Sequence, residues 1–73
     1  KNVLYSVVVR NRAYTGQRLM DWDFVNKMTV SRIRRGNEWL LPHGSTVIEP
    51  GDEIIFSGEF RTADKIRQIL GEK

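Results

Sequence analysis

Residues 47–59, VIEPGDEIIFSGE, join a turn directly to an apolar run, and this junction decides the fold. Proline presets φ at the second position of a β-turn, and glycine accepts the positive φ of the third, so residues 49–52 predict a type II turn. The turn reverses the chain into a strand that ends at Gly58. Because this strand is almost continuously apolar, we expect both of its faces to be covered.

The residues after Gly58 have the spacing of an amphipathic helix, over 60–70. Thr62 is the expected N-cap, Asp64 lies in the first turn where the helix dipole favours it, and Gly71 ends the helix. The apolar stripe consists of Ala63, Ile66, Ile69 and Leu70.

Upstream of the turn, β-branched residues 3–9 predict a strand, and residues 17–22 predict a short helix capped by Thr15. Residues 28–35 and 38–41 predict two strands joined at Gly36-Asn37, the second ending at Pro42. The expected order is strand-helix-strand-strand-strand-helix, a small α+β fold in one domain over residues 1–73.

Strict alternation places Val30 and Ile33 on opposite faces of the strand over residues 28–35. Both side chains are apolar, and a β-bulge between them is required if they are to share the buried face. The alternation alone therefore does not fix the register of this strand.

The chain has 73 residues, no cysteine and a net charge of +3. So short a chain buries only about 60% of its unfolded surface, so part of its stability is expected to come from an oligomer or a neighbouring domain. No apolar run reaches the length of a membrane span. The chain begins with Lys1 rather than Met, and we expect it to be part of a longer protein.

Arg32, Arg34 and Arg35 form the one local excess of charge. They fit either a solvated strand face or an anion site, because guanidinium groups bind phosphate in a bidentate manner. A nucleic-acid-binding module would need a longer basic stripe or a recognised motif, so that function is disfavoured.

Nothing in the sequence indicates catalysis. The chain has no glycine-rich nucleotide loop, and no serine has a visible base partner. His43 is the only histidine, which excludes a multi-histidine metal site. We therefore predict neither an enzyme nor a metal centre.

The order of glycines, Arg, Pro and the Gly-Asp pair resembles the TrkA-C domain, the C-terminal subdomain of RCK proteins that regulate bacterial potassium channels and transporters. The matching residues are Gly16, Leu19, Ile33, Arg35, Gly36, Pro42, Thr46, Val47, Gly51, Asp52 and Gly58.

The resemblance implies a cytoplasmic regulatory domain attached to a membrane transport protein, usually a homodimer, with no cofactor of its own. In some members the dimer cleft binds a small effector such as cyclic di-AMP, which biases the attached gate.

A cyclic dinucleotide needs donors for its phosphates and apolar surface for its bases. Arg35, Asn37 and His43 are the predicted donors, and the predicted apolar floor consists of Val30, Ile33 and Trp39. The alternative is that Trp39 belongs to the hairpin core and Arg35 is a surface charge. A purely structural dimerisation domain without ligand is the competing function.

Overall fold

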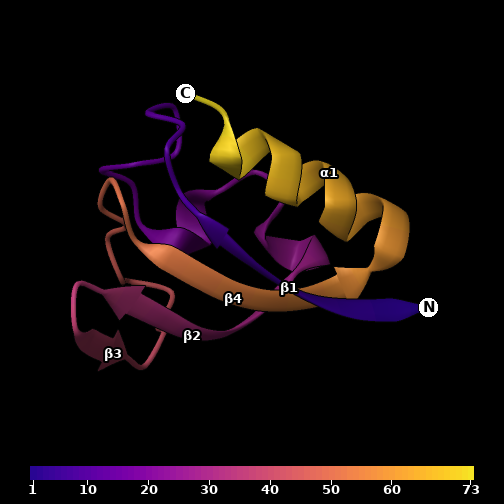
Figure 1. Ribbon diagram of the computed structural model, residues 1–73, viewed down its shortest axis with the longest axis horizontal. Coiled ribbons are helices and arrows are strands. Elements are labelled where there is room, and N and C mark those ends of the chain that lie inside the picture. The colour runs from indigo at the N-terminus through magenta and orange to yellow at the C-terminus, as the bar shows by residue number, and fades with distance from the viewer.

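The computed structural model describes residues 1–73 as one antiparallel sheet with a helix at its C-terminal end (Figure 1). The sheet order is β1-β4-β2-β3. This arrangement confirms the predicted α+β class. The elements are β1 (Asn2–Val8), β2 (Thr29–Arg35), β3 (Glu38–Leu40), β4 (Glu53–Glu59) and α1 (Phe60–Gly71).

The helix covers one face of the sheet and leaves the other face without a covering layer (Figure 1). Ile54 and Phe56 of β4 point to the helix side and are fully buried, whereas Ile55 between them is only half-buried. The expectation that both faces of β4 are covered is therefore wrong. Ile55 is shielded only at its sides, by Ser6 and Arg32 on the neighbouring strands. A continuous apolar run can therefore mark a strand in the middle of a sheet, even when only one face of that strand is buried.

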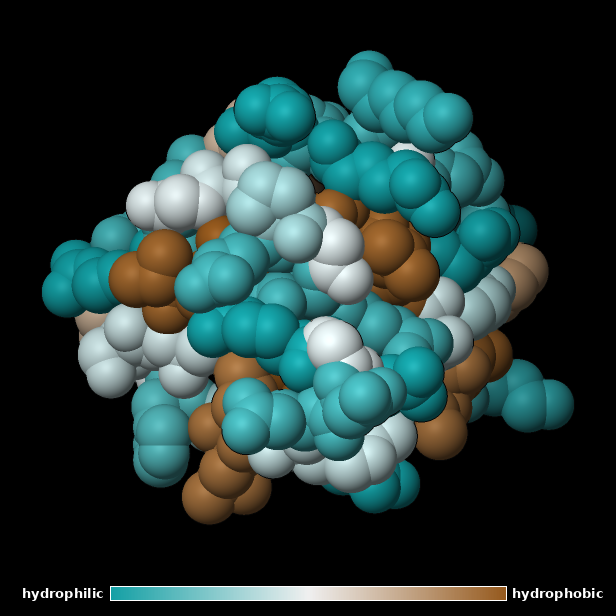
Figure 2. Space-filling model, turned by 60° about the vertical axis from the view of Figure 1, so that its left-hand side comes forward, coloured by the Kyte–Doolittle hydropathy of each residue, from teal (hydrophilic) through white to brown (hydrophobic).

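The core lies between this face, α1 and the segment before β2. Its buried apolar members are Val9, Leu19, Trp22, Met28, Ile33, Ile48, Ile54, Phe56, Ala63, Ile66 and Leu70. Other hydrophobic side chains reach the surface at separate places, as Figure 2 shows for one side of the molecule.

The short helix predicted over residues 17–22 is present only as a 3-10 helix of three residues, Leu19–Asp21. A second 3-10 helix, Val25–Lys27, follows it and was not predicted. The Thr15 hydroxyl donates back to the Arg12 carbonyl at 3.4 Å rather than capping a helix.

Pairing with the loop before β4 explains why no α-helix forms here. The Leu19 N–H donates to the Thr46 carbonyl at 2.8 Å, and the Ile48 N–H donates to the Gln17 carbonyl at 3.0 Å. Backbone groups committed to a distant segment are not available for a helical ladder. The tertiary pairing therefore overrides the local helical pattern.

A β-bulge lies in β2, at the place where the alternation requires one. Val30 faces Phe56 and Arg32 faces Ile55, so Ser31 is the extra residue. The bulge puts Val30 and Ile33 on the same, helix-covered side.

Both predicted turns form. Gly36 has a φ of +61° and Asn37 does not take a positive φ, as in a type II′ hairpin. Gly51 has a φ of +89°, and the Asp52 N–H donates to the Glu49 carbonyl at 3.0 Å. β3 ends at Leu40, one residue before the predicted end.

The ends of α1 differ from the prediction. Glu59, not Thr62, is the N-cap, and its carboxylate accepts the Thr62 N–H at 3.2 Å. The helix includes Gly71 as its last residue, and Glu72 is the C-cap. The last carbonyls are satisfied by the loop after β1, where the Asn11 side chain donates to Ile69 at 2.9 Å. This contact ties the C-terminal end of α1 to the rest of the domain.

Candidate ligand-binding site

Arg35 is held in a buried ion pair at the end of β2. Its Nε and Nη2 donate to the two carboxylate oxygens of Asp52 at 2.9 and 2.8 Å, and Nη2 also donates to the Val47 carbonyl at 3.0 Å. Asp52 is 1% exposed and accepts the Glu49 N–H at 2.9 Å as well. The pair therefore fastens the loop before β4 to the hairpin.

The electrostatics of this cluster limit what Arg35 can bind. Hydrogen bonding to Asp52 raises the pKa of Arg35 above its ordinary value, although burial opposes the shift. Nη1 lies 3.2 Å from the exposed carboxylate of Glu49. Two carboxylates thus surround one guanidinium, and only the Nη1 side faces a partner that solvent can displace.

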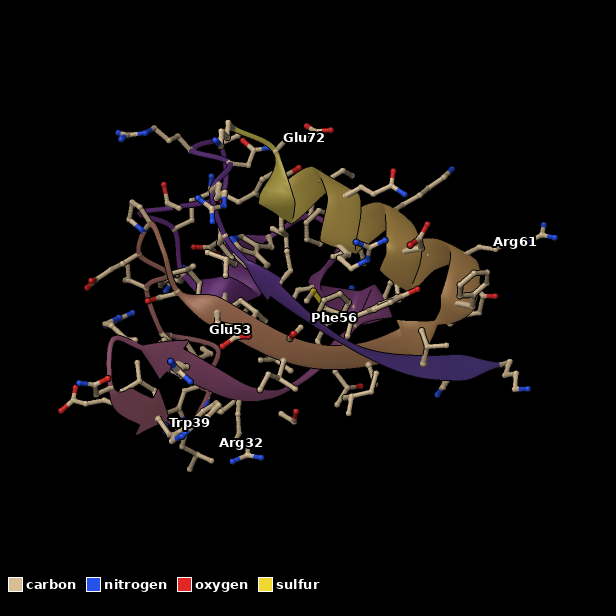
Figure 3. All side chains as sticks on the ribbon, viewed as in Figure 1. Arg32, Trp39, Glu53, Phe56, Arg61 and Glu72 are labelled. Atoms are coloured by element: carbon tan, nitrogen blue, oxygen red, sulfur yellow. The ribbon has the colours of Figure 1, made fainter.

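Trp39 lies on the open face of the sheet with two arginines against its ring. The guanidinium carbons of Arg32 and Arg34 are 4.7 and 5.9 Å from the ring centroid. Figure 3 shows Arg32 and Trp39 pointing away from α1, on the opposite side from Phe56. Neither arginine forms a salt bridge with a carboxylate. The sheet therefore separates this cluster from the helix-covered side.

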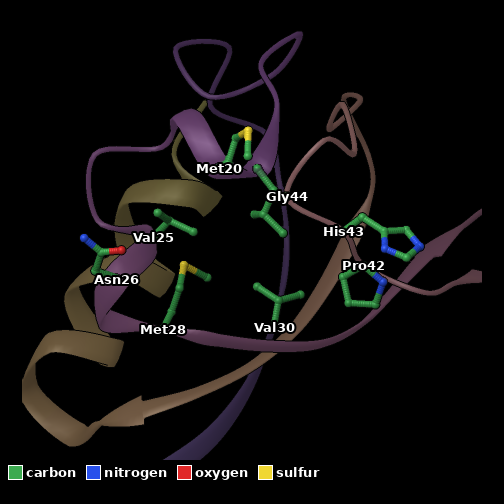
Figure 4. Close-up of a pocket in the computed structure, with 9 residues that line it drawn as sticks. Met20, Val25, Asn26, Met28, Val30, Pro42, His43 and Gly44 are labelled. Atoms are coloured by element: carbon green, nitrogen blue, oxygen red, sulfur yellow. The ribbon is translucent and has the colours of Figure 1, made fainter.

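A pocket of about 340 Å³ opens between the segment before β2 and the loop after β3 (Figure 4). Its lining is mainly apolar, with Asn26 and His43 as its polar side chains. The lining residues are Leu19, Met20, Val25, Asn26, Met28, Val30, Pro42, His43 and Gly44.

Backbone contacts hold the two walls of the pocket together. The Met20 N–H donates to the Gly44 carbonyl at 2.9 Å, and the Leu19 N–H donates to the Thr46 carbonyl at 2.8 Å. Within the loop after β3, the Thr46 hydroxyl accepts the His43 N–H at 3.0 Å. A side chain at Gly44 would place its Cβ 3.0 Å from Met20 Cε. Met20 is half-exposed, and a flexible thioether suits a wall that adapts to its occupant.

The structure brings together two of the six predicted site residues, Val30 and His43, which both line the pocket. Ile33 is fully buried in the core, and Arg35 is paired with Asp52. Asn37 is exposed at the hairpin tip, and Trp39 lies on the open face. The predicted donors and the predicted apolar floor do not form one surface within a single chain.

Sequence reasoning missed the wall built by Met20, Val25 and Met28. The sequence pattern places Met20 in a short helix and Met28 at the start of a strand, and it places Val25 in neither, so the shared position of the three side chains is not visible in it. The available signal was the pair of methionines, the only two in the chain, on either side of a polar stretch. Methionine is common at adaptable binding surfaces.

No group of three or more metal-ligating side chains occurs in the structure, and no helix is long and apolar enough to cross a membrane.

A model of the TrkA-C domain family matches residues 3–71. The chain therefore belongs to the TrkA-C domain family, which is a family of regulatory RCK C-terminal domains of ion transport systems and not a known class of enzyme.

Two relatives connect the chain with transport. A Trk system potassium uptake protein TrkA homolog of Archaeoglobus fulgidus is 36% identical over 64 residues, which are 88% of this chain and 15% of that protein. A protein of Yersinia enterocolitica named as a transport protein is 33% identical over 70 residues, which are 93% of this chain and 13% of that protein. The chain thus spans 13–15% of the length of these relatives.

Solved structures share the fold. "Structure of RCK domain with cda" superposes with a TM-score of 0.85 at 33% identity and covers 92% of this chain and 96% of that one. The RCK_C domain dimer of Streptococcus agalactiae BusR in complex with c-di-AMP superposes with a TM-score of 0.76 at 20% identity, covering 92% and 93%.

Proposed function

We propose that this domain is the regulatory part of an ion transport protein, with potassium the transported ion, and that it binds cyclic di-AMP between two copies of the chain. The observation that carries the proposal is the pocket between the segment before β2 and the loop after β3. Similar solved domains include complexes with c-di-AMP. The parent system, its membrane and the cytosolic position of the domain are part of the same proposal.

The size of the pocket suits half of the ligand. Small-molecule pockets have volumes of roughly 300–1,000 Å³, and this one is at the lower end of that range. Cyclic di-AMP contains two identical adenosine units related by a two-fold axis. One adenine in each of two symmetry-related pockets would match both the ligand and the common two-fold symmetry of protein dimers.

The lining supports an adenine more than a charged group. Met20, Met28 and Val30 offer apolar and thioether surface to a flat base, and Asn26 offers both a donor and an acceptor for its edge. His43 lies at the exposed rim, where its ring can donate to a phosphate oxygen. The Arg35 Nη1 is a second phosphate donor if the phosphate displaces the exposed Glu49.

Regulation follows from differential binding. An effector shifts a conformational equilibrium only to the extent that it binds one state better than the other. A ligand shared by two pockets binds the paired arrangement of the two domains and not the separated one. The difference in binding free energy between the paired and the separated arrangement is the coupling free energy that shifts the conformational equilibrium of the attached transport domain.

Isothermal titration calorimetry with cyclic di-AMP tests the proposal directly. We expect saturable heat with one ligand per two chains, and a rise in melting temperature because the ligand binds only the folded form. Absence of heat up to high micromolar ligand would overturn the proposal and favour a structural dimerisation domain without effector.

Two surface variants locate the site. His43→Ala removes a rim side chain of the pocket, and Asn37→Ala removes an exposed side chain of the hairpin that lies outside the pocket. We expect His43→Ala to weaken binding about tenfold, the loss of roughly one charge-assisted hydrogen bond, and Asn37→Ala to leave it unchanged. The reverse result would move the site to the hairpin tip.

A further inference from the structure

The open face of β2 carries two arginines that no carboxylate neutralises. Arg32 and Arg34 are both exposed, and neither forms a salt bridge. The Arg34 Nε donates to the Gly36 carbonyl at 3.2 Å, which leaves its two Nη groups without a partner. Glu53 lies opposite Arg34 in the register of β4, but it is half-buried and does not approach the guanidinium within salt-bridge distance. Both guanidiniums can therefore bind an anionic group from outside the domain.

Large apolar side chains stand exposed beside these arginines. Trp39 is 48% exposed although both guanidiniums lie against its ring. Leu41 follows β3 directly and is 73% exposed, more than any other large hydrophobic side chain of the domain. β3 is the terminal strand of the sheet, so the two side chains lie at its outer limit (Figure 1). Exposed apolar surface beside polar groups is typical of an interaction site.

The shape of this surface suits a flat partner better than a peptide. Peptides bind in grooves or add a strand to a free sheet edge. The only pocket of the domain lies elsewhere, and its lining includes neither the two arginines nor Trp39. The edge of β3 is a poor template for a further strand, because β3 has three residues and Pro42 follows two positions later. A lipid surface needs neither a groove nor a strand edge.

We propose that Arg32, Arg34, Trp39 and Leu41, here called the hairpin patch, bind the surface of a bilayer that contains anionic lipids. Arginine binds phosphate groups while its alkyl stem covers apolar surface, and tryptophan is enriched at the level of the lipid headgroups. Leucine inserts at the boundary of headgroups and acyl chains. This goes beyond the proposed function, because the contact requires neither the effector nor the pocket.

The contact is weak for a free domain and sufficient for a tethered one. Two arginines and two apolar side chains make a small footprint on a membrane. A domain joined to a membrane transport protein is held close to the bilayer, where a high effective concentration compensates for low affinity. The role of the patch in the parent protein thus rests on the proposed function, whereas the lipid contact of the domain itself does not.

Co-sedimentation with vesicles tests the contact. At an ionic strength of about 0.15 M, the domain should bind vesicles of phosphatidylglycerol and phosphatidylcholine, should not bind vesicles of phosphatidylcholine alone, and should bind less as salt is added. Tryptophan fluorescence locates the contact, because Trp22 is 2% exposed and only Trp39 can meet the lipid. The emission should shift to shorter wavelength with the anionic vesicles, and Trp39→Phe should abolish the shift.

Three variants separate the hairpin patch from general charge attraction. Arg32→Gln/Arg34→Gln should weaken vesicle binding about 25-fold, roughly fivefold for each arginine near an anionic surface. Leu41→Ser should weaken it about tenfold, close to the free energy of burying most of a leucine. The control is Arg10→Gln/Arg12→Gln, which removes the same charge from exposed positions in the loop after β1, and its loss should be much smaller. All of these positions except Leu41 are charged and exposed, and circular dichroism checks that each variant folds.

Four results would overturn the proposal: no binding to anionic vesicles at millimolar lipid, equal losses for the two double arginine variants, sedimentation without a shift of the Trp39 emission, or a polyglutamate peptide that shifts this emission when vesicles do not. The last result would assign the patch to an acidic protein partner. Arg32→Gln/Arg34→Gln should keep its thermal shift with cyclic di-AMP, whereas absence of a thermal shift in every variant speaks only against the ligand.

Discussion

Two regions of β2 use arginine in opposite ways. At its end, Arg35 forms an ion pair with a carboxylate that is 1% exposed, whereas Arg32 and Arg34, three residues and one residue earlier, lie on Trp39 with no acidic partner. All three arginines lie within residues 32–35 and have the same charge. The burial of the partner, rather than the arginine itself, therefore decides which one contributes to the fold.

The largest effect should come from Arg35→Met. This change keeps the bulk of the side chain but leaves the Asp52 carboxylate buried without its counter-charge. We expect a loss of about 3 kcal/mol in the free energy of unfolding, the lower end for breaking a buried pair because Arg35 is one-third exposed. Urea denaturation measures it.

The control on the same strand is Arg34→Met, which should change the free energy of unfolding by less than about 0.5 kcal/mol. A second control combines Arg35→Met with Asp52→Leu, which removes both charges, and should recover part of the loss. Equal losses for Arg34→Met and Arg35→Met would remove the distinction between the two regions.

A smaller effect is expected on the open face. Trp39→Ala should cost about 1 kcal/mol or less, because the ring is 48% exposed in the domain and loses mainly its contacts with the two arginines. A double-mutant cycle with Arg32→Ala should give a coupling of about 0.5–1 kcal/mol. A coupling near zero would mean that the stacking contributes nothing to stability.

The smallest effect on stability is expected at Glu59. Its carboxylate is exposed, unlike the buried carboxylate of Asp52. The Thr62 N–H holds the pKa of Glu59 below its usual range. Because the folded-state pKa is the lower one, the stabilisation is present above the unfolded-state pKa of about 4.3 and is lost as the pH falls through the folded-state value.

Melting temperatures measured across the acid range should therefore show a small gap between the wild type and Glu59→Gln that closes at low pH. Glu72→Gln, which removes an exposed carboxylate that accepts no hydrogen bond, should show no such closing gap.

Local rules predicted the turns well. The Pro50-Gly51 turn, the Gly36-Asn37 hairpin and the need for a bulge near Ser31 each depend on a few neighbouring residues, and each is found in the structure. The family resemblance, carried by the same turn residues, is confirmed by the family model.

Predictions that depend on distant partners were less successful. The helix predicted over residues 17–22 is reduced to the 3-10 helix Leu19–Asp21, because the backbone of this segment pairs with residues 44–48, which no local pattern reveals. The six predicted site residues do not lie on one surface for a related reason. The role of Arg35 is set by Asp52, which is seventeen positions away. Sequence reasoning placed both residues in loops or hairpins, without the contact between them.

The bulge at Ser31 has a consequence for changes in chain length. Ser31 is the surplus residue of β2, and its hydroxyl donates to the Ile55 carbonyl at 3.1 Å. Deleting it would leave a regular strand, with Val30 and Ile33 still facing the helix and Arg35 still reaching Asp52. Deleting Arg34 would instead turn Arg35 to the open face and leave the buried Asp52 carboxylate without a counter-charge. Length variation in this strand is therefore tolerated at the bulge and costly beyond it.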